Sequence, residues 1–375
     1  MNKVAQALKK PVIRTLAAIV LGLLVAGIIL AVAGYPPMKS MLALAKGIFS
    51  KSKYMSNVII KSTPLIFTGL AVAFAFQTGL FNIGAEGQFI IGCLASTIVG
   101  ITVKLPVVLQ VPLVLLAGMA AGAIYGGLIG ILKARFGIHE VISGIMLNWI
   151  ALYLSNYVCM LPVFRNGDSN GTYQVSEASE TLLLGSWKKS EAGMAALKKI
   201  PFFGEALLKT DVNFGFLFAV IAAIVLAVLL RNTTKGFELR AVGFNKFSAE
   251  AVGIDIKKNI LHVMLISGAV AGLGAAFYIT GNSPHKVSVL SAFEGTGTNG
   301  LGVALIAGSS PIGCIFSGLL FGGLLYGGQS LQYEVGAPTE IINIVIGTIV
   351  FFVAVMQGVP AILEKVAGRR AHHAE

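Results

Sequence analysis

Ten long apolar runs, each bounded by charge, proline or glycine, constrain the fold of this chain more than any other feature. About 20 consecutive apolar residues cross the hydrocarbon core of a bilayer, and a soluble core has no room for so many runs of this length. The pattern therefore predicts an all-α polytopic membrane protein with about ten transmembrane helices. They are expected near 12–34, 58–80, 85–104, 107–132, 139–162, 213–230, 258–281, 292–309, 312–331 and 339–357.

Composition and charge agree with this class. Hydrophobic residues make up 56% of the chain and charged residues only 12%, against about 25% charged in soluble proteins. The net charge of +12 comes from basic residues scattered among loops, which indicates contact with membrane lipid rather than with nucleic acid. Neither a metal site nor a disulfide is expected, because three cysteines lie in apolar runs without ligand spacing: Cys93, Cys159 and Cys314.

The distribution of lysine and arginine predicts the orientation. With ten spans, the cluster of Lys3, Lys9 and Lys10, the basic C-terminal end and the basic residues of 231–257 all fall on the cytoplasmic side, as the positive-inside rule favours. One transmembrane domain then fills 1–375, with a cytoplasmic loop at 231–257 and an extracytoplasmic loop at 165–212. The first apolar run exceeds the roughly 7–15 residues of a signal peptide, so we expect it to remain as the first helix.

Two glycine-rich breaks interrupt the apolar pattern. The first, GLFNIGAEGQ at 79–88, contains Glu86, and the second, FEGTGTNG at 293–300, contains Glu294. Polar, glycine-rich backbone at membrane depth is tolerated only where protein buries it or where it lines a water-filled cavity. Each carboxylate either lines a pathway or gate or caps a helix N-terminus. Interrupted segments in corresponding places of two halves indicate an inverted repeat around a central pathway.

Glycines also recur every fourth residue along three predicted spans. Such rows let helix backbones approach closely, and close packing holds helices together in lipid. We therefore expect tight helix crossings at Gly118, Gly122, Gly126 and Gly130, at Gly268 and Gly272, and at Gly318 and Gly322.

The loop at 231–257 carries a second patterned motif. Asn245 is suited to cap a short helix and Gly253 to end it in the left-handed conformation. A short capped helix that bears Phe247 and Ala249 between two spans suggests that another protein packs against it. The alternative is an ordinary interfacial helix.

Catalytic motifs are missing from the sequence. The dipeptide Gly-Lys never occurs, which excludes a P-loop, and no zinc or serine-hydrolase motif is present. If ATP drives transport, another polypeptide must bind it. A secondary carrier acting alone would need an ion-coupling group deep in a span, and the sequence offers none that is convincing.

Three stretches of the sequence together resemble the permease subunits of bacterial ABC importers. They are FNIGAEGQ at 81–88, the loop at 236–253 and the stretch at 299–313. The similarity covers about 55–360 and is closest to the ribose/branched-chain amino acid permease superfamily. Within this superfamily, the residues of the first motif, FNIGAEGQ, resemble those of the nucleoside and simple-sugar branch.

The resemblance implies a type II importer-like fold with two inverted repeats and an ATP-driven import function, with nucleosides as the expected substrate. The implied partners are a second permease subunit, in a heterodimer, a cytoplasmic ABC ATPase and an extracytoplasmic substrate-binding lipoprotein. No cofactor is implied for this chain, because the partner binds ATP. A pentose or simple sugar, or a branched-chain amino acid, remains an alternative substrate.

Two sets of residues are expected to carry this function. The expected pathway residues are Phe81, Asn82, Glu86, Gln88, Phe293 and Asn299. The expected ATPase-coupling residues are Arg240, Gly243, Asn245, Ala249 and Gly253.

The loop at 165–212 is longer than a helix connection requires. Trp187, Phe202 and Phe203 stand in it among lysines and glutamates, whereas disordered segments usually lack such aromatics. We expect the loop to fold onto the outer face and to help dock the substrate-binding protein. The alternative is a loop that only covers the helix bundle.

Overall fold

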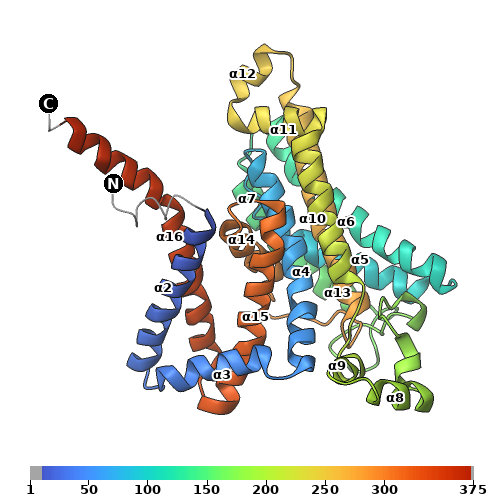
Figure 1. Cartoon of the computed structure of the whole chain (residues 1–375). Helices are drawn as coiled ribbons and strands as arrows, with labels where there is room; N and C mark the ends of the chain where they lie inside the picture. Colours follow the sequence, from blue (N-terminus) through green and yellow to red (C-terminus); the bar gives the residue numbers. More distant parts are fainter. Residues whose placement is uncertain (1–10, 373–375) are drawn as a thin grey trace. The chain divides into compact units, whose positions relative to one another are not determined.

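The computed structural model describes residues 11–372, and in this range the regular structure is helical (Figure 1). Three isolated β-bridges are the only extended pairs among these residues. The prediction of an all-α membrane protein is confirmed. Lys3, Lys9 and Lys10 lie outside the described residues. The α-helices are α2 (Pro11–Val32), α3 (Pro37–Phe49), α4 (Ser52–Gln77), α5 (Ala85–Thr102), α6 (Val107–Phe136), α7 (Glu140–Cys159), α8 (Glu191–Lys198), α9 (Phe203–Lys209), α10 (Gly215–Asn232), α11 (Thr234–Phe244), α12 (Lys246–Ala251), α13 (Ile256–Gly281), α14 (Thr296–Ile306), α15 (Pro311–Val335) and α16 (Thr339–His372).

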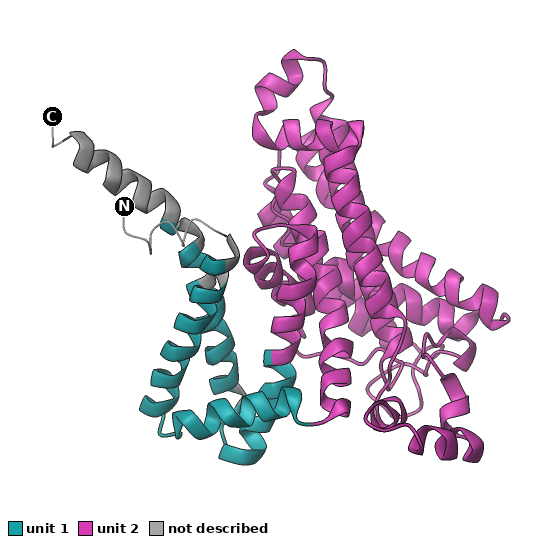
Figure 2. Cartoon of the chain, viewed as in Figure 1, with its two compact units in different colours: residues 1–50, 324–375 teal, residues 51–323 magenta. Residues whose placement is uncertain are grey.

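The chain forms two compact units (Figure 2). Unit 1 combines 1–50 with 324–375, and unit 2 is the continuous stretch 51–323. In unit 1, α2 packs along α16, and a Cβ built on Gly22 would lie only 2.8 Å from Ile349 Cα. The breaks and the loops of interest all belong to unit 2.

Seven helices within 11–372 are long and apolar enough to cross a membrane: α4, α5, α6, α7, α10, α13 and α15. Two shorter apolar stretches, Leu16–Val32 and Glu340–Met356, correspond to the first and last predicted spans. The eighth predicted span, 292–309, differs from expectation, since only Thr296–Ile306 is helical and irregular backbone precedes it. Gly295, with φ +81°, adopts a left-handed conformation that a helix interior does not allow, so the helix begins only after it. The count of ten spans is thus not confirmed.

The row of glycines on α6 packs against α13, as expected. A Cβ on Gly118 would lie 2.9 Å from Gly272 O, and one on Gly126 would lie 3.1 Å from Gly268 Cα. At Gly122 an added Cβ would clash with Gly268 O. Backbones this close leave no room for side chains, so the crossing depends on small residues from both helices.

Unit 2 has two distinct ends (Figure 1). Helices α11 and α12 form one end, where a Cβ on Gly79 would lie 2.6 Å from Gly243 Cα. The folded segment 165–212 forms the other, where Ser176 N–H donates to Gly100 O near the end of α5. Helices α4, α10 and α13 run between these ends.

The segment 165–212 is folded, as expected. It contains the 3-10 helices η1 (Glu177–Ser179) and η2 (Gly185–Lys189) together with α8 and α9. Buried polar contacts attach it to α4 and α6: Ser56 Oγ lies 2.9 Å from Thr210 Oγ1, and Gln110 Nε2 donates to Ser179 Oγ at 3.0 Å.

Candidate functional site

The first break begins where α4 ends. Gly79 has φ +74°, a left-handed conformation that favours glycine, and Leu80 N–H turns back to donate to Ala75 O. Because Gly243 of α11 touches the backbone of Gly79, a side chain at either position would separate the two segments. The break is therefore in direct contact with the α11–α12 end.

Two of the expected pathway residues, Asn82 and Gln88, form a buried amide pair. Asn82 Nδ2 donates to Gln88 Oε1 at 2.9 Å and to Ser267 Oγ at 2.7 Å, and Gln88 Nε2 donates back to Asn82 Oδ1. Ser267 Oγ in turn donates to Ala71 O at 2.7 Å. The network joins α4, α5 and α13, so both amides are satisfied inside the protein.

Helix α7 approaches the break through Asn148. Its Oδ1 accepts from Gly87 N–H at 2.7 Å, and its Nδ2 donates to Ile83 O at 3.1 Å. A Cβ on Gly87 would lie 3.1 Å from Asn148 Cα, and a Cβ on Gly144 would lie 2.9 Å from Gly84 N. Close approach, rather than an unusual φ, is what these glycines provide.

Phe81 lies nearer the α11–α12 end. Its N–H donates to Glu140 Oε1 at 3.4 Å, and its ring packs edge-on against Phe76 with centroids 4.7 Å apart. Glu140 also pairs with Lys133 across the α6–α7 turn. This ion pair is largely withdrawn from solvent and attaches the break to the turn.

Glu86 connects the two breaks. Its side chain is 1% exposed, and its oxygens accept from Gly295 N–H at 3.1 Å and Thr298 N–H at 2.8 Å. Those groups form the start of α14, so Glu86 caps a helix about 200 residues away rather than its own. A Cβ on Gly297 would clash with Glu86 N and Cα. The two breaks, separate in sequence, thus meet directly.

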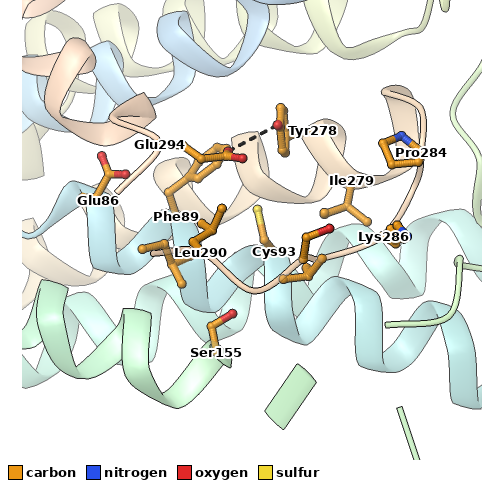
Figure 3. Close-up of a pocket in the computed structure, with 13 residues that line it drawn as sticks. Glu86, Phe89, Cys93, Ser155, Tyr278, Ile279, Pro284, Lys286, Leu290 and Glu294 are labelled. Carbon is orange, nitrogen blue, oxygen red and sulfur yellow. Dashed lines mark hydrogen bonds between the residues drawn. The ribbon is translucent and has the colours of Figure 1, made fainter. Parts of the chain in front are cut away.

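A cavity of about 130 Å³ lies next to this junction. Its walls are α5, α7, α13 and the extended segment 284–294, and Figure 3 shows Glu294 directed toward Tyr278. Tyr278 Oη donates to Glu294 Oε2 at 3.3 Å. The polar and aromatic lining includes Glu86, Phe89, Cys93, Ser155, Tyr278 and Glu294.

The two remaining expected pathway residues, Phe293 and Asn299, do not line the cavity. Phe293 packs on Trp149 of α7 with ring centroids 4.6 Å apart. Asn299 lies in the first turn of α14, where its N–H donates to Gly295 O. Of the six expected pathway residues, only Glu86 lines the cavity.

The α11–α12 corner is set by three caps. Thr233 Oγ1 accepts from Gly236 N–H, Asn245 Oδ1 accepts from the N–H groups of the next helix, and Asp255 Oδ1 accepts from Lys258 N–H. The last bond lowers the pKa of the exposed Asp255 carboxyl. Gly253 has φ +82°, so both predicted features of the short helix, its Asn cap and its glycine end, are confirmed.

The corner exposes apolar side chains. Phe244 and Phe247 are 97% and 84% exposed, whereas Ala249 is 2% exposed and packs within the chain. Arg240 is exposed beside Gly243, and both line a groove with Phe76 and Ser309. Exposed aromatic side chains on a short helix suit a protein interface.

Several residues of the site were not expected from the sequence. Asn148, Ser267 and Glu140 hold the first break, and Tyr278 lines the cavity. Asn148 and Ser267 are polar residues inside apolar runs, and this position alone could have indicated a polar contact within the bundle. Nothing in the sequence indicates that their partners lie in the 79–88 break.

Replacing Gly84 by valine is expected to stop transport while the permease still assembles. A Cβ there would clash with Ile129 Cδ1, and Ile129 is fully buried, so the break must shift. The measurement is substrate uptake alongside co-purification of the partners. Gly347→Val is the matched control, because a Cβ at Gly347 meets no atom within 4 Å. Normal uptake by Gly84→Val would show the break to be a passive linker.

Interrupted helices, a buried carboxylate and a cavity with two carboxylates in its lining, inside an apolar helical bundle, define a membrane transport protein. The family described as branched-chain amino acid transport system, permease component, matches residues 54–354, and the chain belongs to this family of ABC transporter permeases.

Three relatives cover nearly the whole chain. A guanosine ABC transporter permease protein, NupP of Bacillus subtilis, is 38% identical over 95% of this chain and 97% of its own length. The nucleoside ABC transporter permease protein NupB of Lactococcus lactis is 33% identical over 97% and 96%. The glucose ABC transporter permease protein TsgB13 of Haloferax volcanii is 30% identical over 91% and 86%. No solved structure matches the chain at a significant level.

Proposed function

We propose that this chain is one of two permease subunits of an ABC importer for nucleosides. The observation that carries the proposal is its likeness, over nearly the full length, to permeases named for guanosine and nucleoside transport. A second permease named for guanosine, NupQ of Bacillus subtilis, is 28% identical over 59% of this chain. Two different permeases from one organism support a heterodimer.

In this proposal the chain binds no ATP and catalyses no reaction. The α11–α12 corner faces the cytoplasm, with both chain termini on that side, and an ATPase docks on Phe244 and Phe247. Movement of α11 passes to the first break through the Gly243–Gly79 contact. The first break then transmits this movement to α14 through the hydrogen bonds of Glu86. Alternating access follows from the reorientation of these joined segments.

A competition experiment tests the substrate class. Cells that lack their own nucleoside uptake would express the chain with its ATPase, second permease and binding protein. Uptake of labelled guanosine is expected, and unlabelled adenosine should compete with it while glucose and leucine should not. Uptake of glucose instead would favour the sugar alternative that the likeness to TsgB13 raises.

Within 165–212, the exposed aromatics of η2 and α9 are expected to contribute to docking of the binding protein. Trp187 and Phe203 are 47% and 65% exposed, and exposed aromatic anchors dominate many interfaces. Trp187→Ala with Phe203→Ala should raise the half-saturation for uptake by roughly tenfold, with the ATPase still bound.

The double variant tests docking more selectively than replacement of 176–205 by a Gly/Ser linker would. That replacement would also remove the buried hydrogen bond between Ser179 and Gln110. Tyr173→Ala serves as the control, since its exposed side chain lies outside η2, α8 and α9. Unchanged capture of the binding protein by the double variant would leave 165–212 as a cover for the bundle.

A further inference from the structure

We propose that the cavity beneath segment 284–294 is a subsite for the ribose ring of a nucleoside in transit, and that Glu294 and Tyr278 select for its hydroxyls. The inference rests on the proposed nucleoside transport and adds to it the part of the substrate that this chain recognises.

The cavity lies deep in the apolar bundle. From Glu86, the 18-residue α5 extends roughly 27 Å to the 165–212 end, and from Thr296 the 11-residue α14 extends roughly 16 Å the other way. A hydrocarbon core is about 30 Å thick. The junction of the two breaks, with Glu294 beside it, therefore lies within membrane depth.

Glu294 is exposed at this depth, together with Ser291. A carboxylate that faced hydrocarbon would cost several kcal/mol, so such groups face a water-filled cavity or another protein. The mouth of the cavity at Glu294 must therefore open toward an aqueous pathway or toward the second subunit that encloses it. A substrate moving along that pathway would pass Glu294.

The size and lining of the cavity fit one hydroxylated ring. Its volume of about 130 Å³ is close to that of cavities of about 150 Å³ that hold a single benzene ring. The rings of Phe89 and Tyr278, with centroids 5.5 Å apart, offer apolar walls. The oxygens of Glu294 can accept hydrogen bonds from adjacent hydroxyls of a sugar ring. Hydrogen bonds to an ionised carboxylate are stronger than those to a neutral acceptor. A whole nucleoside is too large, so the base stays outside.

The wall of the cavity is held in place before any substrate arrives. Asn156 Nδ2 donates to Leu290 O at 2.8 Å, and Leu290 N–H donates to Asn156 Oδ1 at 3.0 Å. Val289 N–H donates to Asn170 O at 2.9 Å, and Glu86 fixes the far end at Gly295. A preformed wall lowers the ordering cost of binding.

The test compares guanosine with 2′-deoxyguanosine in the assembled importer, reconstituted with saturating binding protein. The variants are Glu294→Gln, which weakens the acceptor, and Tyr278→Phe, which removes only the hydroxyl. Glu334→Gln, an exposed carboxylate of α15 outside the cavity, is the matched control. Co-purification and basal ATP hydrolysis check that each complex assembles.

We expect Glu294→Gln to lower guanosine transport roughly tenfold and 2′-deoxyguanosine transport much less, so that the two rates converge. Tyr278→Phe should lower the ratio of guanosine to 2′-deoxyguanosine transport as well, by a smaller factor. Equal losses for both substrates, or an unchanged ratio in assembled complexes, would overturn the ribose subsite. A wild-type complex that carries neither substrate would instead contradict the proposed function.

Discussion

Ala249→Arg is expected to abolish coupled transport while the helical bundle still inserts and folds. Ala249 is 2% exposed, so its methyl group packs inside the α11–α12 corner. An arginine there cannot be accommodated, since overpacking alone costs about 1–3 kcal/mol and the buried charge adds to it. We expect α12 to detach and the ATPase to be lost from the purified complex.

Two control variants separate the internal role of Ala249 from direct docking. Ala249→Ser keeps the volume small and should retain uptake. Phe247→Ala leaves the corner folded but removes an 84% exposed ring, so it should weaken ATPase capture without disturbing the bundle. Normal ATPase yield and full uptake with Ala249→Arg would show that α12 does not couple ATP hydrolysis to transport.

Glu86→Ala is expected to reduce uptake by roughly a hundredfold. The change removes both acceptors from the N–H groups of Gly295 and Thr298. Each buried N–H left without a partner costs about 1–3 kcal/mol. The start of α14 would then separate from α5, and the two breaks would no longer move together. Uptake and partner co-purification are the measurements.

Glu86→Gln is the matched control, because its carbonyl oxygen can still accept one of the two bonds. It should retain a clear part of the activity that Glu86→Ala loses. If the alanine variant transports at the wild-type rate, Glu86 does not hold the two breaks together.

The class of protein could be predicted from the sequence because few backbone structures are stable inside a membrane. Long apolar runs must be helices, since lipid offers no partners for backbone groups. The rows at Gly118 and Gly272 predict a close crossing for the same local reason, and the structure confirms it. Asn245 and Gly253 act within one short helix, so their capping geometry also follows from adjacent residues.

Features that depend on contacts between distant segments were not predictable. The sequence left Glu86 as a pathway residue or a cap, and nothing local indicates that it caps α14. The direction of the Ala249 methyl group depends on how α12 packs against α11 and α13. The eighth span was expected over 292–309, but the helix begins only after Gly295 and has 11 residues.

The central claim is that this permease imports nucleosides with energy from a partner ATPase. The most direct measurement is accumulation of labelled guanosine in proteoliposomes that contain the complete complex, binding protein and enclosed ATP. We expect accumulation above the external concentration with ATP and none with a non-hydrolysable analogue. Accumulation that an ion gradient drives without ATP, or no accumulation of any nucleoside by an assembled complex that hydrolyses ATP, would contradict it.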